Sequence, residues 1–333
     1  MEEEIRIWID IKNSHEPLLF KSLMRDLPYE FYITARDYAE VIPLLKKYGI
    51  PYKKVGGFHA KNKITKAVYL GWRSLRLALT VPKFDFFLSH GSIYGIIASK
   101  IRFRKSITIF DGDITSPILK RIFRYSDYLI LTEFTNYKKF GIDDSKVRIF
   151  HGFKEDIYIA DLNPEECPKE IPFEKGEYVI IRPEAYGAYY VSMDKTIVPE
   201  LIRLFNKENI NVVLLPRYPE EREKYSKFSN VYIPPNPING ICGAYYAKAV
   251  LTGSGTLGRE AACMGTIAVS FFPGKELLSV DRELINRGWL FHSRNPEEIV
   301  NYVLNASKRK ESIERSKKVK KEVVEIIKEI VGD

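Results

Sequence analysis

The residues best suited to chemistry form a glycine-containing turn after an apolar run, Val250-Leu251-Thr252-Gly253-Ser254-Gly255-Thr256-Leu257-Gly258-Arg259-Glu260. We expect a strand to end before the small residues and a helix to begin near Thr256. The first amides of a helix lack partners and its dipole is positive there, so Ser254, Gly255 and Thr256 form a predicted site for a diphosphate. Glu260 lies one turn further on the same helix face, where its carboxylate could accept hydrogen bonds from a ribose. The alternative is a turn that binds nothing.

Two arginines follow other predicted strands in the same half of the chain. Arg182 comes directly after the apolar run Tyr178 to Ile181, and Arg217 comes shortly after the run Val212 to Leu215. A guanidinium can contact two phosphate oxygens at once. We therefore predict that Arg182 and Arg217 bind the phosphates of a nucleotide. Surface ion pairs are the alternative.

Candidate groups for proton transfer lie in the first half of the chain. His15 comes just before Pro17 at an expected helix start, after the first predicted strand. An imidazole has an unperturbed pKa of about 6.5, so it can remove a hydroxyl proton near neutrality. The alternative for His15 is a local capping or hydrogen-bonding role.

Polar residues also follow the next two predicted strands. His90-Gly91-Ser92 could hold an anion through its amides, and Asp111 could act as a base or bind a sugar hydroxyl. A plain turn is the alternative for Asp111. Because Asp111 and Asp113 have no adjoining histidine or third carboxylate, we expect no metal site.

Basic residues are concentrated in one stretch. The 333 residues include 52 Lys and Arg against 43 Asp and Glu, a formal net charge of +9. No acidic residue lies between Glu40 and Asp85, where ten Lys and Arg occur. Residues 46–83 also contain aromatic side chains, a combination that favours an anionic lipid or polyanionic acceptor. A solvated basic face is the alternative, and nucleic acid is not an expected partner because no recognition motif is present.

Composition excludes several classes of protein. With 45% hydrophobic and 29% charged residues the chain has enough apolar material for two domains and is not disordered. No run approaches 18 uncharged apolar residues, so we expect no transmembrane segment. The acidic N-terminus and three cysteines without a CxxC pair favour a cytoplasmic protein, with a peripheral position at the inner membrane surface left open. Cys242 and Cys263 are expected to be buried thiols.

The elements that position these residues alternate between strands and helices, which is typical of parallel α/β folds. Residues 161–176 combine three prolines with charge and are a predicted linker between domains 1–160 and 177–306. The tail 307–333 is a predicted amphipathic helix that packs back across the domain boundary. Strands are predicted in the first domain at Ile5 to Ile11, Phe31 to Thr34, Phe84 to Ser89, Ser106 to Phe110, Asp127 to Leu131 and Val147 to Phe150. In the second they are predicted at Tyr178 to Ile181, Val212 to Leu215, Val231 to Ile233, Ala249 to Thr252, Ile267 to Phe271 and Trp289 to Phe291.

The glycine-containing turn resembles the Ser-Gly-Gly-x-x-x-Glu-Ala segment of UDP-N-acetylglucosamine 2-epimerases. Those enzymes belong to the GT-B superfamily, so the resemblance implies two Rossmann-like, doubly wound domains facing across a cleft. It also implies that Ser254 and Gly255 hold UDP phosphates and that Glu260 holds the ribose. Thr256 stands where that segment has its second glycine. The threonine side chain leaves less room for the backbone to come close to a phosphate.

Two further resemblances refine this picture. The chain lacks the Gly-Thr-Arg-Pro-Glu turn of those epimerases, and His15 instead resembles the histidine that many GT-B sugar transferases place near the acceptor. Five motifs are similar to those of an uncharacterised family of archaeal and bacterial GT-B-like proteins. They are Trp8-Ile9-Asp10-Ile11, His151-Gly152-Phe153-Lys154-Glu155, Ile181-Arg182-Pro183-Glu184, Leu215-Pro216-Arg217-Tyr218 and the run from Gly255-Thr256 to Ala261-Ala262.

Together these observations favour a GT-B glycosyltransferase. It would move a sugar from a nucleotide-diphosphate donor, UDP-linked by resemblance, to an anionic or lipid-linked acceptor. His15 and Asp111 are the candidate catalytic residues, and no cofactor beyond the nucleotide-sugar substrate is expected. Two alternatives stay open: a non-catalytic protein that binds a nucleotide sugar or polyanion, and a UDP-sugar 2-epimerase.

Overall fold

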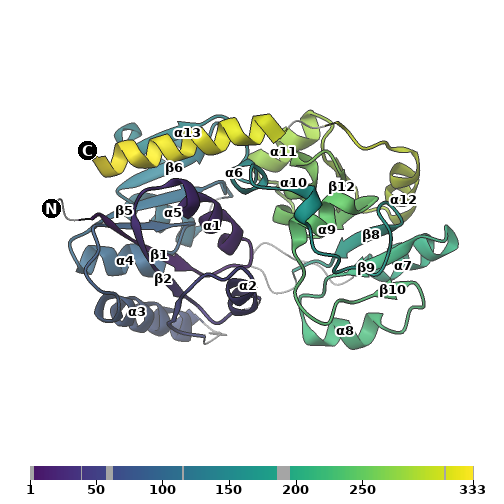
Figure 1. Ribbon diagram of the computed structural model, residues 1–333, viewed down its shortest axis with the longest axis horizontal. Helices are drawn as coiled ribbons and strands as arrows, with labels where there is room; N and C mark the ends of the chain where they lie inside the picture. The colour runs from purple at the N-terminus through teal and green to yellow at the C-terminus, as the bar shows by residue number, and fades with distance from the viewer. Residues whose placement is uncertain are drawn as a thin grey trace. The chain divides into compact units, whose positions relative to one another are not determined.

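The computed structural model describes residues 4–38, 40–57, 63–114, 116–185, 196–310 and 313–332 (Figure 1). The chain divides into two compact units. The N-terminal unit comprises Met1–Tyr158 and Ser316–Asp333, and the C-terminal unit comprises Ile159–Arg315. Each unit is built around its own parallel sheet with helical crossovers, so the prediction of two Rossmann-like α/β domains is confirmed.

The N-terminal unit contains a seven-stranded sheet in the order β3-β2-β1-β4-β5-β6-β7. Its central strands are buried on both faces and therefore read as apolar runs, which is why the sequence predicts them well. Strand β3 has only two exposed lysines and no apolar pattern, so it is absent from the prediction. The strands are β1 (Arg6–Ile11), β2 (Glu30–Ala35), β3 (Lys53–Lys54), β4 (Phe86–Ser89), β5 (Lys105–Phe110), β6 (Tyr128–Thr132) and β7 (Val147–Phe150).

Helices cover both faces of this sheet. Residues from α3, α4 and α5 share one hydrophobic cluster with Trp8, whose ring centroid lies 5.2 Å from that of Phe84 and 4.3 Å from that of Phe87. The apolar side of α1, including Leu19 and Leu23, is also buried. The helices are α1 (Glu16–Asp26), α2 (Val41–Lys47), α3 (Lys63–Thr80), α4 (Ile93–Ile101), α5 (Pro117–Tyr125), α6 (Asp156–Ile159) and α13 (Ile313–Gly332).

Helix α13 is the predicted amphipathic helix, and it is grouped with the N-terminal unit (Figure 1, yellow). The apolar residues spaced along its sequence are all buried: Val319, Val323, Ile326, Ile327 and Ile330. Polar contacts add to this packing. Lys320 Nζ lies 2.7 Å from Asp26 Oδ2, and Ser316 Oγ donates a 2.7 Å hydrogen bond to Asp156 Oδ1.

The C-terminal unit contains a six-stranded sheet in the order β10-β9-β8-β11-β12-β13. Its strands are β8 (Tyr178–Arg182), β9 (Asn211–Leu214), β10 (Val231–Tyr232), β11 (Ala249–Thr252), β12 (Ile267–Ser270) and β13 (Phe291–His292). Its helices are α7 (Val198–Lys207), α8 (Pro219–Tyr225), α9 (Gly240–Tyr246), α10 (Gly255–Cys263), α11 (Ser279–Asn286) and α12 (Pro296–Asn305). Phe205, Tyr225 and Phe271 are buried in its main hydrophobic cluster.

The cysteines correct one expectation. Cys242 is not a free thiol, because it forms a disulfide with Cys167 across a Cα–Cα distance of 5.5 Å. The two residues are 75 positions apart in sequence, and only the fold brings them together. The bond ties the proline-rich segment 161–176 to α9. Cys263 is a buried free thiol, as predicted, and among the described residues no helix has the length and apolar character needed to cross a bilayer.

The pairing of His151 with Glu322 generates a prediction about pH. His151 Nδ1 lies 2.6 Å from Glu322 Oε1, and this hydrogen bond raises the pKa of His151. The resulting stabilisation is present below the unfolded-state pKa of about 6.5 and is lost as pH rises through the higher folded-state pKa. Glu322→Gln should therefore lower the urea midpoint more at pH 5.5 than at pH 9. Glu325→Gln, which removes an exposed pair with Lys328, is the control. An equal loss at both pH values would contradict the assignment.

Candidate functional site

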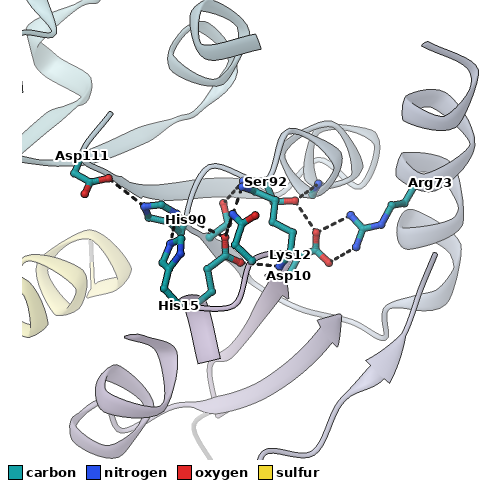
Figure 2. Close-up of polar contacts among 11 residues, drawn as sticks. Asp10, Lys12, His15, Arg73, His90, Ser92 and Asp111 are labelled. Carbon is teal, nitrogen blue, oxygen red and sulfur yellow. Dashed lines mark hydrogen bonds and ion pairs between the residues drawn. The ribbon is translucent and has the colours of Figure 1, made fainter. Parts of the chain in front are cut away.

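The N-terminal unit gathers ionisable side chains at one edge of its sheet. Strands β1, β4 and β5 are neighbours and parallel, so the segments that follow them meet at the same edge. His15 comes from the turn between β1 and α1, His90 follows β4, and Asp111 follows β5 (Figure 2). The ends of parallel strands are where open α/β sheets bind ligands.

These three residues form a chain of hydrogen-bonding contacts (Figure 2). His15 Nε2 lies 3.2 Å from His90 Nδ1, and His90 Nε2 lies 3.4 Å from Asp111 Oδ1. Asp111 Oδ2 also lies 2.9 Å from Nζ of the buried Lys154. The structure thus connects the two predicted catalytic residues through His90, which the sequence analysis considered only as part of an anion-binding turn. The motif residue Lys154 anchors the far end of the chain.

One consistent arrangement of protons follows from these contacts. If His90 Nε2–H donates to Asp111, His90 Nδ1 accepts a hydrogen bond from His15 Nε2–H. The lone pair on Nδ1 of His15 is then the basic position, and within the described residues that atom has no hydrogen-bond partner. Burial, and then the charge of Lys154, lower the pKa of His15 well below its ordinary value. The ring is therefore neutral near pH 7.

Glu16 is a further member of the cluster that sequence reasoning missed. Its side chain is fully buried, accepts 2.7 Å hydrogen bonds from Lys12 N and Asn13 Nδ2, and lies 3.6 Å from His90 Nδ1. Burial raises the pKa of Glu16, but Lys12 and His90 lower it by more, so the net shift is downward. His15, Glu16 and His90 each offer one atom that could bind a metal ion, and these three atoms lie within 4.8 Å of one another. The sequence signal that could have identified Glu16 is its position just before Pro17 at an expected helix start, where an acidic residue is favourable.

A buried ion pair between Asp10 and Arg73 is linked to the segment that carries His90. Asp10 accepts two 2.9 Å hydrogen bonds from Arg73 and a 2.6 Å bond from Ser92 Oγ (Figure 2). It also accepts a 2.8 Å bond from Thr34 Oγ1. Asp10 and Arg73 have no exposed surface. Arg73 is therefore not part of a basic surface, which corrects its inclusion among the ten cations of residues 46–83. Lys61 of that stretch lies outside the described residues.

From the buried Asp10–Arg73 pair we expect mutation of Asp10 to lower the free energy of unfolding strongly. Asp10→Asn would leave the Arg73 guanidinium buried without a counter-charge, which typically costs about 3–5 kcal/mol of unfolding free energy. Asp37→Asn is the control because it removes an exposed ion pair, with Lys54 at 3.0 Å, and should cost no more than about 1 kcal/mol. Urea denaturation of both variants checks this. Equal losses would show that Asp10 is not the main electrostatic support of the unit.

The C-terminal unit brings two of the predicted phosphate-binding residues together. Arg217 donates from Nε to the Pro183 carbonyl at 2.8 Å and from Nη2 to Ser254 Oγ. Arg182 donates from Nη1 to the carbonyl of Leu215 at 3.1 Å and to that of Pro216 at 2.9 Å. These contacts join the ends of β8, β9 and β11. Arg217 lies at the predicted anion site, whereas Arg182 stabilises the loop that carries it.

The start of α10 has the form expected of an anion site. Ser254 is the N-cap residue but makes no side-chain cap, because its hydroxyl contacts Arg217 and lies 3.1 Å from Thr252 Oγ1. The first amides of the helix, at Gly255 and Thr256, therefore receive no bond from this side chain. Helix amides in this state bind anions.

Glycine at position 255 leaves room for a neighbouring arginine. A Cβ at Gly255 would lie 2.2 Å from Nη1 of Arg259, which is itself held by Asp281 Oδ1 at 3.0 Å. Arg259 is not among the predicted site residues, and its buried position becomes clear only in the structure. Glu260 is also nearly buried, with 6% of the residue exposed, and its contact with ribose stays a prediction.

Comparison with protein families and curated proteins gives two matches. A model of the family described as "Protein of unknown function (DUF354)" matches residues 5–333. An uncharacterized protein of Methanocaldococcus jannaschii is 24% identical over 318 residues, which is 89% of this chain and 90% of that protein.

Solved structures that resemble this chain have the GT-B architecture. A UDP-GlcNAc 2-epimerase of M. jannaschii, in complex with UDP-GlcNAc and UDP, has a TM-score of 0.75 and 15% identity and covers 97% of this chain and 99% of its own. The Neisseria meningitidis UDP-GlcNAc 2-epimerase bound to UDP-GlcNAc has a TM-score of 0.72 and 13% identity, with coverages of 99% and 100%. The glycotransferase of kitacinnamycin has a TM-score of 0.59 and 12% identity, with 99% of both chains covered. The fold is therefore GT-B, as the sequence resemblance implied.

Proposed function

The chain belongs to the DUF354 family, and we propose that it is a GT-B glycosyltransferase that transfers a sugar from a UDP-sugar donor to an anionic, lipid-linked acceptor. The observation that carries this proposal is the open start of α10, where Arg217 contacts Ser254 and the helix amides receive no side-chain cap. Such a position suits the two negative phosphates of a nucleoside diphosphate. The solved complexes of similar fold with UDP-GlcNAc support uridine as the base.

The donor would be bound by the C-terminal unit. The diphosphate would accept hydrogen bonds from the amides of Gly255 and Thr256 and from the Arg217 guanidinium, with Ser254 at the same turn. Arg182 would act indirectly, by holding the Leu215–Pro216 segment in place. Glu260 would accept hydrogen bonds from the ribose. Positive groups at the diphosphate would stabilise the charge that develops as UDP leaves.

The N-terminal unit would supply the base. The acceptor oxygen would bond to the anomeric carbon while the bond from that carbon to UDP breaks, and the electron pair of that bond would leave with UDP. The acceptor hydroxyl proton would pass to Nδ1 of His15. Asp111 would not contact the acceptor; through His90 it would keep the His15 proton on Nε2. In this proposal Asp111 is a positioning residue, and its predicted direct catalytic role stays a prediction.

The acceptor would bind beside α3. One face of this helix is an exposed apolar stripe of Ile64, Val68, Trp72, Leu75 and Leu79, with exposures from 45% to 78%. Exposed Lys66 and Arg76 lie on the same helix. A hollow of about 360 Å³ at its side is lined by Asp37, Lys54, Gly56, Gly57, Trp72 and Arg76. Apolar side chains interspersed with cations suit the surface of an anionic membrane, where a lipid-linked acceptor would be found.

Nucleotide binding tests the donor assignment. Glu260→Ala should weaken UDP binding by about 1.5–3 kcal/mol, because a hydrogen bond to a charged group is lost. Glu283→Ala, which removes an exposed ion pair with Arg287 in the same unit, is the matched control and should leave affinity unchanged. Isothermal titration calorimetry with UDP measures both. Unchanged affinity of the Glu260 variant would remove Glu260 from the site.

Vesicle binding tests the acceptor assignment. Cosedimentation with anionic vesicles should decrease steeply between low and physiological salt, because exposed charges are screened over about 8 Å at 0.15 M. Changing Lys66 and Arg76 to Ala, or Leu75 and Leu79 to Asp, should reduce it further. Leu304→Asp, at an exposed position on α12, is the control. Salt-insensitive binding, or none at low salt, would favour a small soluble acceptor.

The epimerase alternative is favoured by one observation, the likeness of fold to UDP-GlcNAc 2-epimerases. Incubation with UDP-GlcNAc separates the functions. Release of UDP only when vesicles with a lipid-linked acceptor are present would support transfer. A changed sugar on intact nucleotide, without acceptor, would identify an epimerase. UDP binding with neither product would identify a non-catalytic protein.

A further inference from the structure

Two imidazoles and one carboxylate converge at the edge of the N-terminal sheet. The atoms that face one another are Nε2 of His15, Nδ1 of His90 and Oε1 of Glu16. His15 Nε2 and His90 Nδ1 are 3.2 Å apart, and His90 Nδ1 and Glu16 Oε1 are 3.6 Å apart. The sequence predicts no metal site, because Asp111 and Asp113 have no adjoining histidine or third carboxylate in the sequence. The fold removes that premise, since it brings His90 next to Asp111.

These separations match the geometry of a tetrahedral zinc site. With metal–ligand bonds of about 2.0–2.1 Å, the ligand atoms of a tetrahedral ion are about 3.3 Å apart. The two distances at His90 lie on either side of that value. All three donor atoms lie within 4.8 Å of one another, so small side-chain rotations would complete the arrangement. Two histidines and one glutamate are also a ligand set that leaves the fourth zinc position open.

Neighbouring groups orient the side chains of His90 and Glu16 through hydrogen bonds, as outer residues do at metal sites. Asp111 Oδ1 lies 3.4 Å from Nε2 of His90, the carboxylate–histidine arrangement that orients a ligating imidazole. Oε2 of Glu16 accepts the Lys12 amide at 2.7 Å, which fixes the carboxylate. Glu16 and His90 are buried, whereas His15 is partly exposed, so the open fourth position would be next to His15.

Two neighbours compete with an ion for Oε1 of Glu16. Asn13 Nδ2 donates a 2.7 Å hydrogen bond to this atom and would have to rotate away when an ion binds. Lys12 Nζ lies 3.6 Å from Oε1 of Glu16, so its ammonium group would have to move when a cation binds. The Lys12 side chain is 19% exposed, which gives it access to solvent. Asp111 already pairs with Lys154 at 2.9 Å, so Glu16 supplies the carboxylate charge that faces an ion.

We propose that His15, Glu16 and His90 form a binding site for a divalent transition metal ion, with zinc the ion that the donor set and spacing fit best. The proposal goes beyond the glycosyltransferase assignment and does not depend on it. An ion would use Nε2 of His15 and keep the ring proton on Nδ1. Metal loading and the base role of His15 are therefore mutually exclusive states of one site.

Direct metal binding tests the proposal without reference to activity. The full chain, stripped with chelator and dialysed against zinc, should retain one zinc per chain by mass spectrometry of the metal. Cobalt loading should give the intense visible absorption of a tetrahedral ion. His15→Gln and His90→Gln should each abolish both signals. His151→Gln, which changes a histidine paired with a carboxylate elsewhere in the same unit, is the control and should retain them.

A fourth variant separates the site from a loss of folding. Asp111→Asn keeps all three ligands and should weaken zinc affinity by about 10–100-fold, as removal of an outer carboxylate does at established sites. Circular dichroism checks that each variant is folded. Wild-type chain without bound zinc, unchanged binding in folded His15→Gln, or loss of binding in His151→Gln would each overturn the proposal. UDP binding measured on the same samples reports on the donor site separately.

Discussion

The N-terminal unit depends on the neutralisation of one buried carboxylate. Asp10 ends up with no exposed surface because it lies near the end of the central strand β1. A buried charge is tolerated only when it is paired and hydrogen-bonded, and Asp10 is satisfied by Arg73, Ser92 and Thr34. These partners come from α3, from the N-cap residue of α4, and from β2. One electrostatic requirement therefore connects four segments that are distant in sequence.

Two features of functional interest follow from this connection. Ser92 is two residues from His90, so the bond from Ser92 to Asp10 helps to fix the loop that places His90 between His15 and Asp111. Arg73 anchors the inner side of α3, which leaves the stripe containing Trp72 and Leu79 exposed. Loss of the Asp10–Arg73 pair would therefore disturb both the position of His90 in the ionisable cluster and the packing of α3.

The two units use the ends of their strands in different ways. In the N-terminal unit the strand ends carry carboxylates and imidazoles in direct contact, a composition suited to moving protons or binding a metal ion. In the C-terminal unit they carry an arginine and the uncapped amides of α10, a composition suited to anions. The same topology thus provides two chemically distinct edges. This difference between the units is the physical basis of the functional proposal.

Much of the fold could be predicted from sequence, because buried parallel strands are apolar runs bounded by turns. Strand β3 could not, since Lys53 and Lys54 carry no such pattern and pair with β2 only through the backbone. The Cys167–Cys242 bond and the Asp10–Arg73 pair join residues 75 and 63 positions apart, and neither has a local signal. At the candidate sites, the strand-end rule singled out His15, Asp111, Arg217 and Ser254, whose functional roles stay predictions. It missed Glu16 and the linking role of His90, which depend on side-chain directions that spacing alone does not fix.

The central claim is that a nucleoside diphosphate binds at the start of α10. A crystal structure of the protein with UDP tests it most directly. The account predicts that the β-phosphate accepts hydrogen bonds from the amides of Gly255 and Thr256 and contacts Arg217. UDP bound elsewhere in the chain, or bound at this turn through its base with the phosphates directed away from α10, would contradict it.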